Sequence, residues 1–159
     1  MKAEDKIVSL QQAVLLAKEW KNSGQKAVFT NGCFDILHLG HVDYLEKARS
    51  LGDKLILALN TDSSVKRQNK GPERPINSEY ARARILASLF FVDMVVLFDD
   101  NTPYDIISVL LPDILVKGDD YAVDNIVGAD VVIKNGGEVK TIPLVQGYST
   151  TSIINKLKS

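Results

Sequence analysis

The chain is poor in cysteine and histidine, nearly balanced in charge and free of long apolar runs. Its one cysteine, Cys33, excludes an intramolecular disulfide and suits a reducing compartment. The net charge of −1 argues against a general nucleic-acid-binding protein, which is normally basic. No segment reaches the roughly 18 apolar residues of a membrane span, and the charged N-terminus does not resemble a signal peptide. We therefore expect a cytoplasmic protein with neither nucleic acid nor membrane as a partner.

The length and composition indicate one small domain. With 159 residues and 45% hydrophobic content, the chain can bury one core. We expect a single domain over residues 1–159, with an N-terminal helical extension (1–24) and a catalytic core (26–159). Helical and β-rich patterns alternate along the chain, which is typical of an α/β fold. The prediction is a Rossmann-like, doubly wound domain with a mainly parallel five-stranded sheet and helices on both faces.

The expected elements follow from hydrophobic spacing and from turn residues. Apolar runs predict strands at 27–30, 55–60, 94–98 and 114–117, with short β-like runs at 131–134 and 139–142. Helical spacing predicts helices at 42–51, 78–89, 104–111 and 150–157, and an earlier helix from a Ser9/Gln12 capping box to Gly24.

Both histidines of the chain, His38 and His41, lie in one short segment at a strand-to-helix junction, residues 30–41. Gly32 permits a tight turn and a close approach of backbone to ligand, and Gly40 leaves the two imidazoles uncrowded. The free amides and the dipole at a helix start attract anions. The segment therefore predicts a phosphate-binding site at the carboxyl end of a strand.

Two other interpretations of the histidine pair are a metal site and a merely polar helix entrance. A zinc site would need a third ligand from Cys33, and the chain supplies no other cysteine or histidine. We therefore predict no metal held by protein ligands alone.

A basic stretch follows in residues 66–84, where six basic side chains oppose two acidic ones. Such an excess of four positive charges can attract phosphates, although a solvated helix face is an equally good explanation for Lys66, Arg67 and Arg84. Lys70 is a better candidate, because it begins a Gly- and Pro-containing loop at 70–77 that could close over a ligand.

Two further segments are candidates for the same site. Residues 116–121 follow a buried strand and include Lys117, Gly118, Asp120 and Tyr121, although they could form an ordinary acidic turn. Residues 147–151 place three hydroxyls at a helix start, where they could cap the helix or also bind the β- and γ-phosphates of a nucleotide.

These residues resemble a known family. Gly32-Cys33-Phe34-Asp35 followed by His38-Leu39-Gly40-His41 resembles the signature of the cytidylyltransferase-like nucleotidyltransferases. Ser149-Thr150-Thr151 with Ile153-Ile154 resembles their second signature, and the resemblance extends from about Lys26 to the C-terminus. It implies catalytic roles for His38, His41, Lys70 and Arg82, and substrate binding by Asp35, Lys70 and Arg82. It implies nucleotide binding by Asn31, Gly32, Cys33, Phe34, His38, His41, Lys117, Gly118, Asp120, Tyr121, Ser149, Thr150 and Thr151.

Two subfamilies compete for the substrate. The loop at 70–77 and the segments 102–103, 111–118, 135–139 and 147–151 resemble adenylyltransferases that act on D-glycero-D-manno-heptose 1-phosphate. The glycerol-3-phosphate cytidylyltransferases have an arginine five residues before the serine, where this chain has Leu144. The resemblance implies transfer of an adenylyl group from ATP, with bound Mg²⁺, to the heptose phosphate. The products would be pyrophosphate and ADP-heptose for bacterial surface polysaccharide.

Three expectations accompany this assignment. The heptose enzyme is often fused to a sugar kinase, so a chain that stands alone would depend on a separate kinase. A non-catalytic nucleotide-binding module is a less favoured alternative, because binding alone needs no donors directed at a transition state. A homo-oligomer, a dimer or larger, is expected from the frequency of symmetric assemblies.

Overall fold

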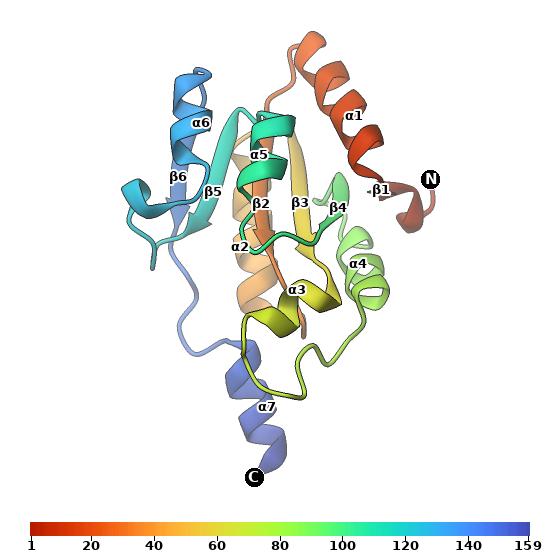
Figure 1. Ribbon diagram of the computed structural model, residues 1–159, viewed down its shortest axis with the longest axis vertical. Coiled ribbons are helices and arrows are strands. Elements are labelled where there is room, and N and C mark those ends of the chain that lie inside the picture. Colours follow the sequence, from red (N-terminus) through yellow and green to blue (C-terminus); the bar gives the residue numbers. More distant parts are fainter.

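The computed structural model describes all 159 residues as an α/β domain built on a parallel sheet (Figure 1). The strands follow the order β1-β4-β3-β2-β5-β6, and every neighbouring pair is parallel. Their bounds are β1 Ile7–Val8, β2 Ala27–Gly32, β3 Lys54–Asn60, β4 Met94–Phe98, β5 Ile114–Gly118 and β6 Glu138–Ile142. The doubly wound architecture predicted from the sequence is confirmed.

The sheet has six strands and not the five predicted. The additional strand, β1, pairs Ile7 with Val95 and Val8 with Val96 at the edge of the sheet. Its two residues are too few to show the alternation that marks a strand in sequence. Residues that precede the histidine segment at 30–41 thus contribute directly to the sheet.

Helices cover both faces of the sheet, as predicted. One face carries α1 (Leu10–Asn22), α5 (Tyr104–Leu110) and α6 (Ala129–Lys134), and the other carries α2 (Leu39–Ser50) and α4 (Glu79–Ala87). Side chains alternate between the two cores along β3: Leu55, Leu57 and Leu59 pack with α2 and α4, while Ile56 and Ala58 pack with α1 and α5. This placement explains why parallel strands read as continuous apolar runs.

The β-like run predicted at 131–134 is wrong, because these residues form most of α6. Since β5 and β6 are parallel, the chain between them must cross over one face of the sheet. Val132 is buried in the core on that face, and tertiary packing therefore outweighs the β preference of Val131, Val132 and Ile133.

Several helix boundaries follow from the caps read in the sequence. Ser9 and Gln12 form the predicted capping box of α1, and Ser78 caps α4. The remaining elements are α3 (Asp62–Arg67), α7 (Thr150–Lys158) and the 3₁₀ turns Ala3–Lys6 and Val123–Asn125. No helix combines the length and the apolar character needed to cross a membrane.

The strand order determines where a ligand can bind. Strands β4, β3 and β2 extend to one side, and β5 and β6 extend to the other, so the order reverses between β2 and β5. Loops at the carboxyl ends of these two strands separate there and leave a crevice. Helix α7 lies beyond these strand ends (Figure 1), and it completes the crevice from the far end of the chain.

Candidate active site

The main cavity lies at the carboxyl ends of β2 and β5 and has a volume of about 600 Å³. Residues from five separate segments line it: the end of β2, the start of α2, the loop after α3, the end of β5 and the start of α7. All thirteen residues predicted to bind nucleotide are among them, together with Asp35, Gly40, Tyr44, Lys70, Arg74, Leu144, Val145 and Tyr148. The structure thus brings together every predicted site residue except Arg82.

The two imidazoles are stacked at the start of α2. Their ring centroids are 3.7 Å apart, and Phe34 contacts His41 edge-on from the other side. A side chain at Gly40 would bring its Cβ within 2.9 Å of the His38 ring, so glycine is needed for this arrangement. The backbone N–H of His38 donates to Nδ1 of His41 at 3.3 Å, which leaves the proton of a neutral His41 on Nε2.

Burial changes the acid–base behaviour of this pair. It lowers the pKa of His41 to about 4, and repulsion from His38 adds to the effect, against a backbone hydrogen bond to Ile36 that raises it. Burial also lowers the pKa of His38. At neutral pH both rings are therefore neutral, and each carries one N–H donor.

The lowered pKa predicts a pH-dependent stability. An unfolded His41 takes up a proton near pH 6.5, whereas the folded one does so only near pH 4. Between these values the unfolded state binds more protons, so the free energy of unfolding falls with decreasing pH, by up to about 3 kcal/mol from this group. Urea unfolding from pH 7 to 4 should show a shallower decline for His41→Gln than for the wild type. Equal declines would contradict the pKa assignment.

The hydroxyl cluster at the start of α7 faces the imidazoles. The Ser149 hydroxyl caps the helix by accepting from the backbone N–H of Ser152, and Thr150 Oγ1 lies 3.5 Å from the carbonyl oxygen of Ile36 in the histidine segment. Tyr148 stacks over His38 with 6.5 Å between ring centroids. The amides of Thr150 and Thr151, the first two residues of α7, have no partner within the helix and can bind an anion.

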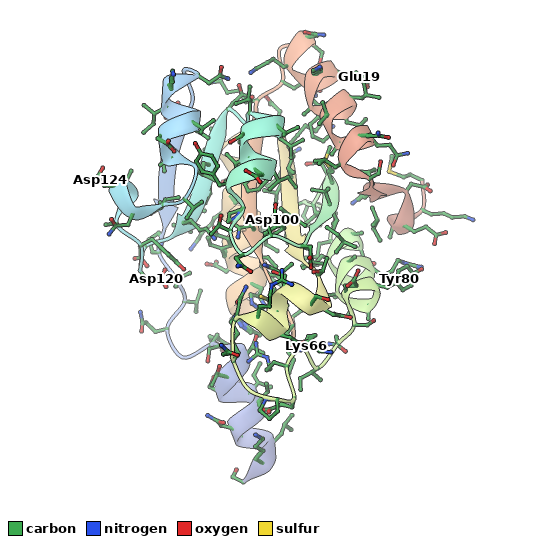
Figure 2. All side chains as sticks on the ribbon, viewed as in Figure 1. Glu19, Lys66, Tyr80, Asp100, Asp120 and Asp124 are labelled. Carbon is green, nitrogen blue, oxygen red and sulfur yellow. The ribbon has the colours of Figure 1, made fainter.

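Two lysines that line the main cavity, Lys70 and Lys117, lie near each other. The Lys70 Nζ lies 3.6 Å from Sγ of Cys33, and Lys117 projects from β5 with its Nζ 5.6 Å from the ring centroid of Tyr121. Burial lowers the pKa of Lys117 to about 8, although the nearby Asp120 raises it. Asp120 itself lies in the exposed loop after β5 (Figure 2). Both lysines can neutralise a ligand phosphate at this point.

A second cavity of about 320 Å³ adjoins the first and shares Asn31, Cys33, Lys70 and Lys117 with it. Its other walls come from the end of β3, the residue that follows α3, the end of β4 and the loops after β4 and β5. They are rich in amides and hydroxyls, which suit a polyhydroxylated ligand: Asn60, Gln68, Asn101, Thr102 and Asn125. The buried Oδ1 of Asn31 has no protein partner where the two cavities meet.

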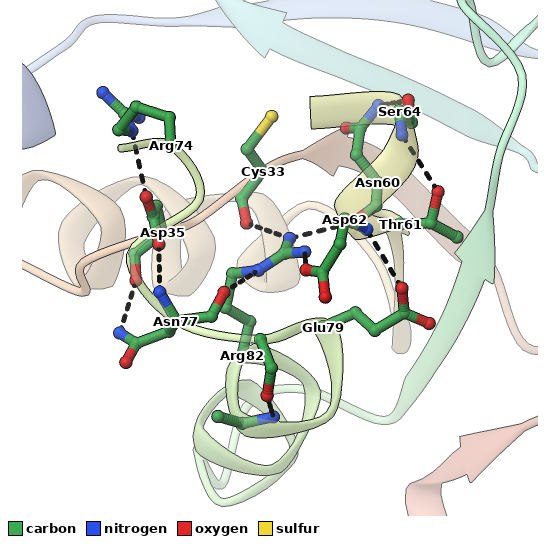
Figure 3. A network of polar contacts seen from close by, with 12 residues as sticks. Cys33, Asp35, Asn60, Thr61, Asp62, Ser64, Arg74, Asn77, Glu79 and Arg82 are labelled. Carbon is green, nitrogen blue, oxygen red and sulfur yellow. Dashed lines mark hydrogen bonds and ion pairs between the residues drawn. The ribbon is translucent and has the colours of Figure 1, made fainter. Parts of the chain in front are cut away.

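Arg82 does not line either cavity, contrary to its predicted role in substrate binding. Its side chain is fully buried, and its Nε donates to the carbonyl oxygen of Asn77 (Figure 3). Its Nη1 donates to the carbonyl oxygens of Cys33 and Asn60, and its Nη2 pairs with Asp62 at 2.7 Å. Because its donors are engaged in this way, Arg82 connects the loops around the site. Neither of its Nη groups is available to bind a phosphate.

Asp35 lines the main cavity, but its carboxylate is committed to the protein. It accepts hydrogen bonds from the backbone amides of Ile76 and Asn77 and from Nε of Arg74 (Figure 3). This buried carboxylate therefore fixes the loop that carries Lys70, and its oxygens accept hydrogen bonds from the protein, unlike the substrate-binding role predicted for it.

Several lining residues were not singled out in the sequence. Tyr44 follows His41 by three positions, so helical spacing alone places both on one side of α2. Its hydroxyl bonds to Thr30 and Val116 behind the cavity. The polar residues of the second cavity lie in loops, where no periodic pattern marks them.

A known family of proteins matches this fold and this site. The model of the Cytidylyltransferase-like family matches residues 29–156, and the chain belongs to this family. It is 52% identical over 153 residues to the bifunctional protein HldE of Azorhizobium caulinodans, and 54% identical over 155 residues to that of Magnetococcus marinus. These alignments cover 96% and 98% of the chain. The chain spans 32% of the length of either relative.

Among solved structures, the lipopolysaccharide core biosynthesis protein of Thermoplasma volcanium GSS1 is similar. The two chains share 30% sequence identity with a TM-score of 0.62, and the match covers 79% of this chain and 100% of the other. The family predicted from the two signatures is thus confirmed.

Proposed function

We propose that the protein transfers the adenylyl group of ATP to D-glycero-D-manno-heptose 1-phosphate and releases pyrophosphate. The observation that carries this proposal is the convergence of His38, His41 and the start of α7 on one cavity. Neutral ring donors, hydroxyls and free helix amides are the groups that bind a polyphosphate.

The second cavity is the proposed site of the sugar phosphate. Its amide and hydroxyl lining suits sugar hydroxyls, and Lys70 and Lys117 stand where it meets the main cavity. A sugar phosphate bound there would present its phosphate to the lysines and to the α-phosphate of a nucleotide in the main cavity.

The reaction needs no nucleophile from the protein. A phosphate monoester is largely dianionic at neutral pH, since its second pKa is about 6. One of its oxygens attacks the α-phosphorus and forms a new P–O bond, while the bond between that phosphorus and the α,β-bridging oxygen breaks. The electron pair leaves with pyrophosphate. The protein aligns the groups and stabilises charge on the equatorial and leaving oxygens through His38, His41 and Lys70.

Mg²⁺ is proposed to accompany the nucleotide. Mg²⁺ keeps several waters and uses one or two carboxylates plus substrate phosphates, so a full set of protein ligands is not required. Asp120 fits this role, because it lines the main cavity and accepts no hydrogen bond within the protein. When bound, the ion supplies positive charge to the phosphate oxygens.

The choice of substrates is supported by the resemblance to the heptose subfamily and by the similarity to the HldE relatives over nearly the whole chain. Leu144, which lines the main cavity, provides no guanidinium where the cytidylyltransferases have one.

The experiment is a matrix of the four nucleoside triphosphates against heptose 1-phosphate and glycerol 3-phosphate, read as pyrophosphate release in the presence of Mg²⁺. The proposal predicts the highest kcat/KM for ATP with heptose 1-phosphate. Preference for CTP with glycerol 3-phosphate would replace it by the cytidylyltransferase alternative. Nucleotide binding without turnover of any pair would favour a binding module.

A further inference from the structure

The loop before α4 and the first turn of α4 each contribute one buried arginine, Arg74 and Arg82, and the donor groups of the two are used differently. Arg82 has all three nitrogens of its guanidinium bonded to protein oxygens. Arg74 is almost as buried, with its side chain 6% exposed, but its only side-chain hydrogen bond is the 2.9 Å bond from Nε to Asp35. Its two Nη groups have no protein acceptor and point away from Asp35 (Figure 3).

A purely structural partner of Asp35 would not need this geometry. Arginine pairs most strongly with a carboxylate through two parallel hydrogen bonds, and these would use an Nη group as well as a second donor. Asp35 instead takes two backbone amides and a single end-on contact from Arg74. Asp35 thus holds Nε of Arg74 and leaves both Nη groups without a protein acceptor in a side chain that is nine-tenths buried.

The position of Arg74 indicates what its two Nη groups, the Nη fork, can bind. Arg74 lines the main cavity together with the histidine pair and with Ser149, Thr150 and Thr151 at the start of α7. The loop is also tied to α7, since Glu73 pairs with Lys158 at 3.2 Å. Because Leu144 supplies no charge from the segment before α7, Arg74 is the cavity's only guanidinium.

We propose that the Nη fork of Arg74 binds the β- and γ-phosphoryl oxygens of the nucleotide and then the departing pyrophosphate. The inference rests on the proposed nucleotidyl transfer but not on the identity of the acceptor. A planar fork held by Asp35 is already oriented for two adjacent phosphate oxygens, so little side-chain freedom is lost on binding. Charge that accumulates on the leaving pyrophosphate strengthens the same contacts.

The test is the binding of Mg²⁺-pyrophosphate and of AMP to Arg74→Lys, measured by calorimetry. Lysine keeps the charge beside Asp35 but removes the fork. We expect pyrophosphate affinity to fall about 10–100-fold and AMP affinity to change by less than about twofold, since AMP lacks both outer phosphates. Arg84→Lys is the matched control, because Arg84 is exposed on α4 and outside both cavities; it should bind both ligands as the wild type does.

Equal losses for pyrophosphate and AMP, or no loss, would overturn the assignment. If Arg74→Lys fails to fold, the wild-type protein decides the matter by side-chain NMR. The Nη resonances of Arg74 should shift on addition of pyrophosphate and stay in place with adenosine, and unmoved resonances at saturating pyrophosphate would overturn it. These measurements need no acceptor, so a failure of heptose turnover leaves their outcome interpretable.

Discussion

Replacing His41 by alanine should lower kcat by about 10²–10³-fold while the domain stays folded. The expected loss is large because His41 is a neutral donor whose ring is fixed by Phe34, by His38 and by the bond from the His38 amide. A contact that strengthens in the transition state lowers kcat more than it raises KM. Steady-state kinetics for both substrates, with circular dichroism as the folding check, measure this effect.

His41→Gln is the matched variant, because glutamine keeps an N–H donor of similar reach. It should retain more activity than His41→Ala if hydrogen-bond donation is the role of the ring. Near-normal turnover of the alanine variant would refute the catalytic assignment. Equal losses in the two variants would indicate that the imidazole acts by its shape and packing.

Replacing Arg82 by methionine should lower the free energy of unfolding by about 3–5 kcal/mol, because a hydrogen-bond network loses its fully buried central donor and Asp62 loses its partner. The carbonyl oxygens of Cys33, Asn60 and Asn77 would also lose their hydrogen bonds. Urea unfolding of Arg82→Met and of Arg84→Met, whose side chain is exposed, measures the difference. The Arg84 variant should stay within about 0.5 kcal/mol of the wild type.

The same pair of variants distinguishes the structural role of Arg82 from the phosphate-binding role predicted from sequence. If Arg82→Met were as stable as the wild type but had a greatly raised KM for nucleotide, its placement in the structure would be contradicted.

The sequence allowed much of the fold to be predicted because the parallel strands are buried on both faces. Their apolar runs, such as Leu55 to Leu59, have no polar interruption that would blur their ends. The sequence did not predict β1, α3 or α6, and for β1 and α6 the physical reason is plain. The two residues of β1 are stabilised by pairing with β4, and α6 depends on Val132 packing under a crossover. Neither of these interactions is visible in a local pattern.

The candidate site could be predicted where its residues are neighbours in the sequence at one helix start. His38 and His41 lie together because they share a helix start, and Ser149 caps the helix that it precedes. Arg74 and Arg82 show where prediction from the sequence fails. Both lie in the basic stretch 66–84, and only their tertiary partners, Asp35 for Arg74 and Asp62 and Asn60 for Arg82, show how differently their donors are used.

The central claim is that one triphosphate lies between the imidazole pair and the start of α7. A crystal structure with the non-hydrolysable α,β-methylene analogue of ATP tests it most directly. The account predicts phosphate oxygens within hydrogen-bond distance of His41 Nε2 and of the first amides of α7, with the second cavity left open to the sugar phosphate. A triphosphate in the second cavity, or phosphates without contact to either histidine, would contradict it.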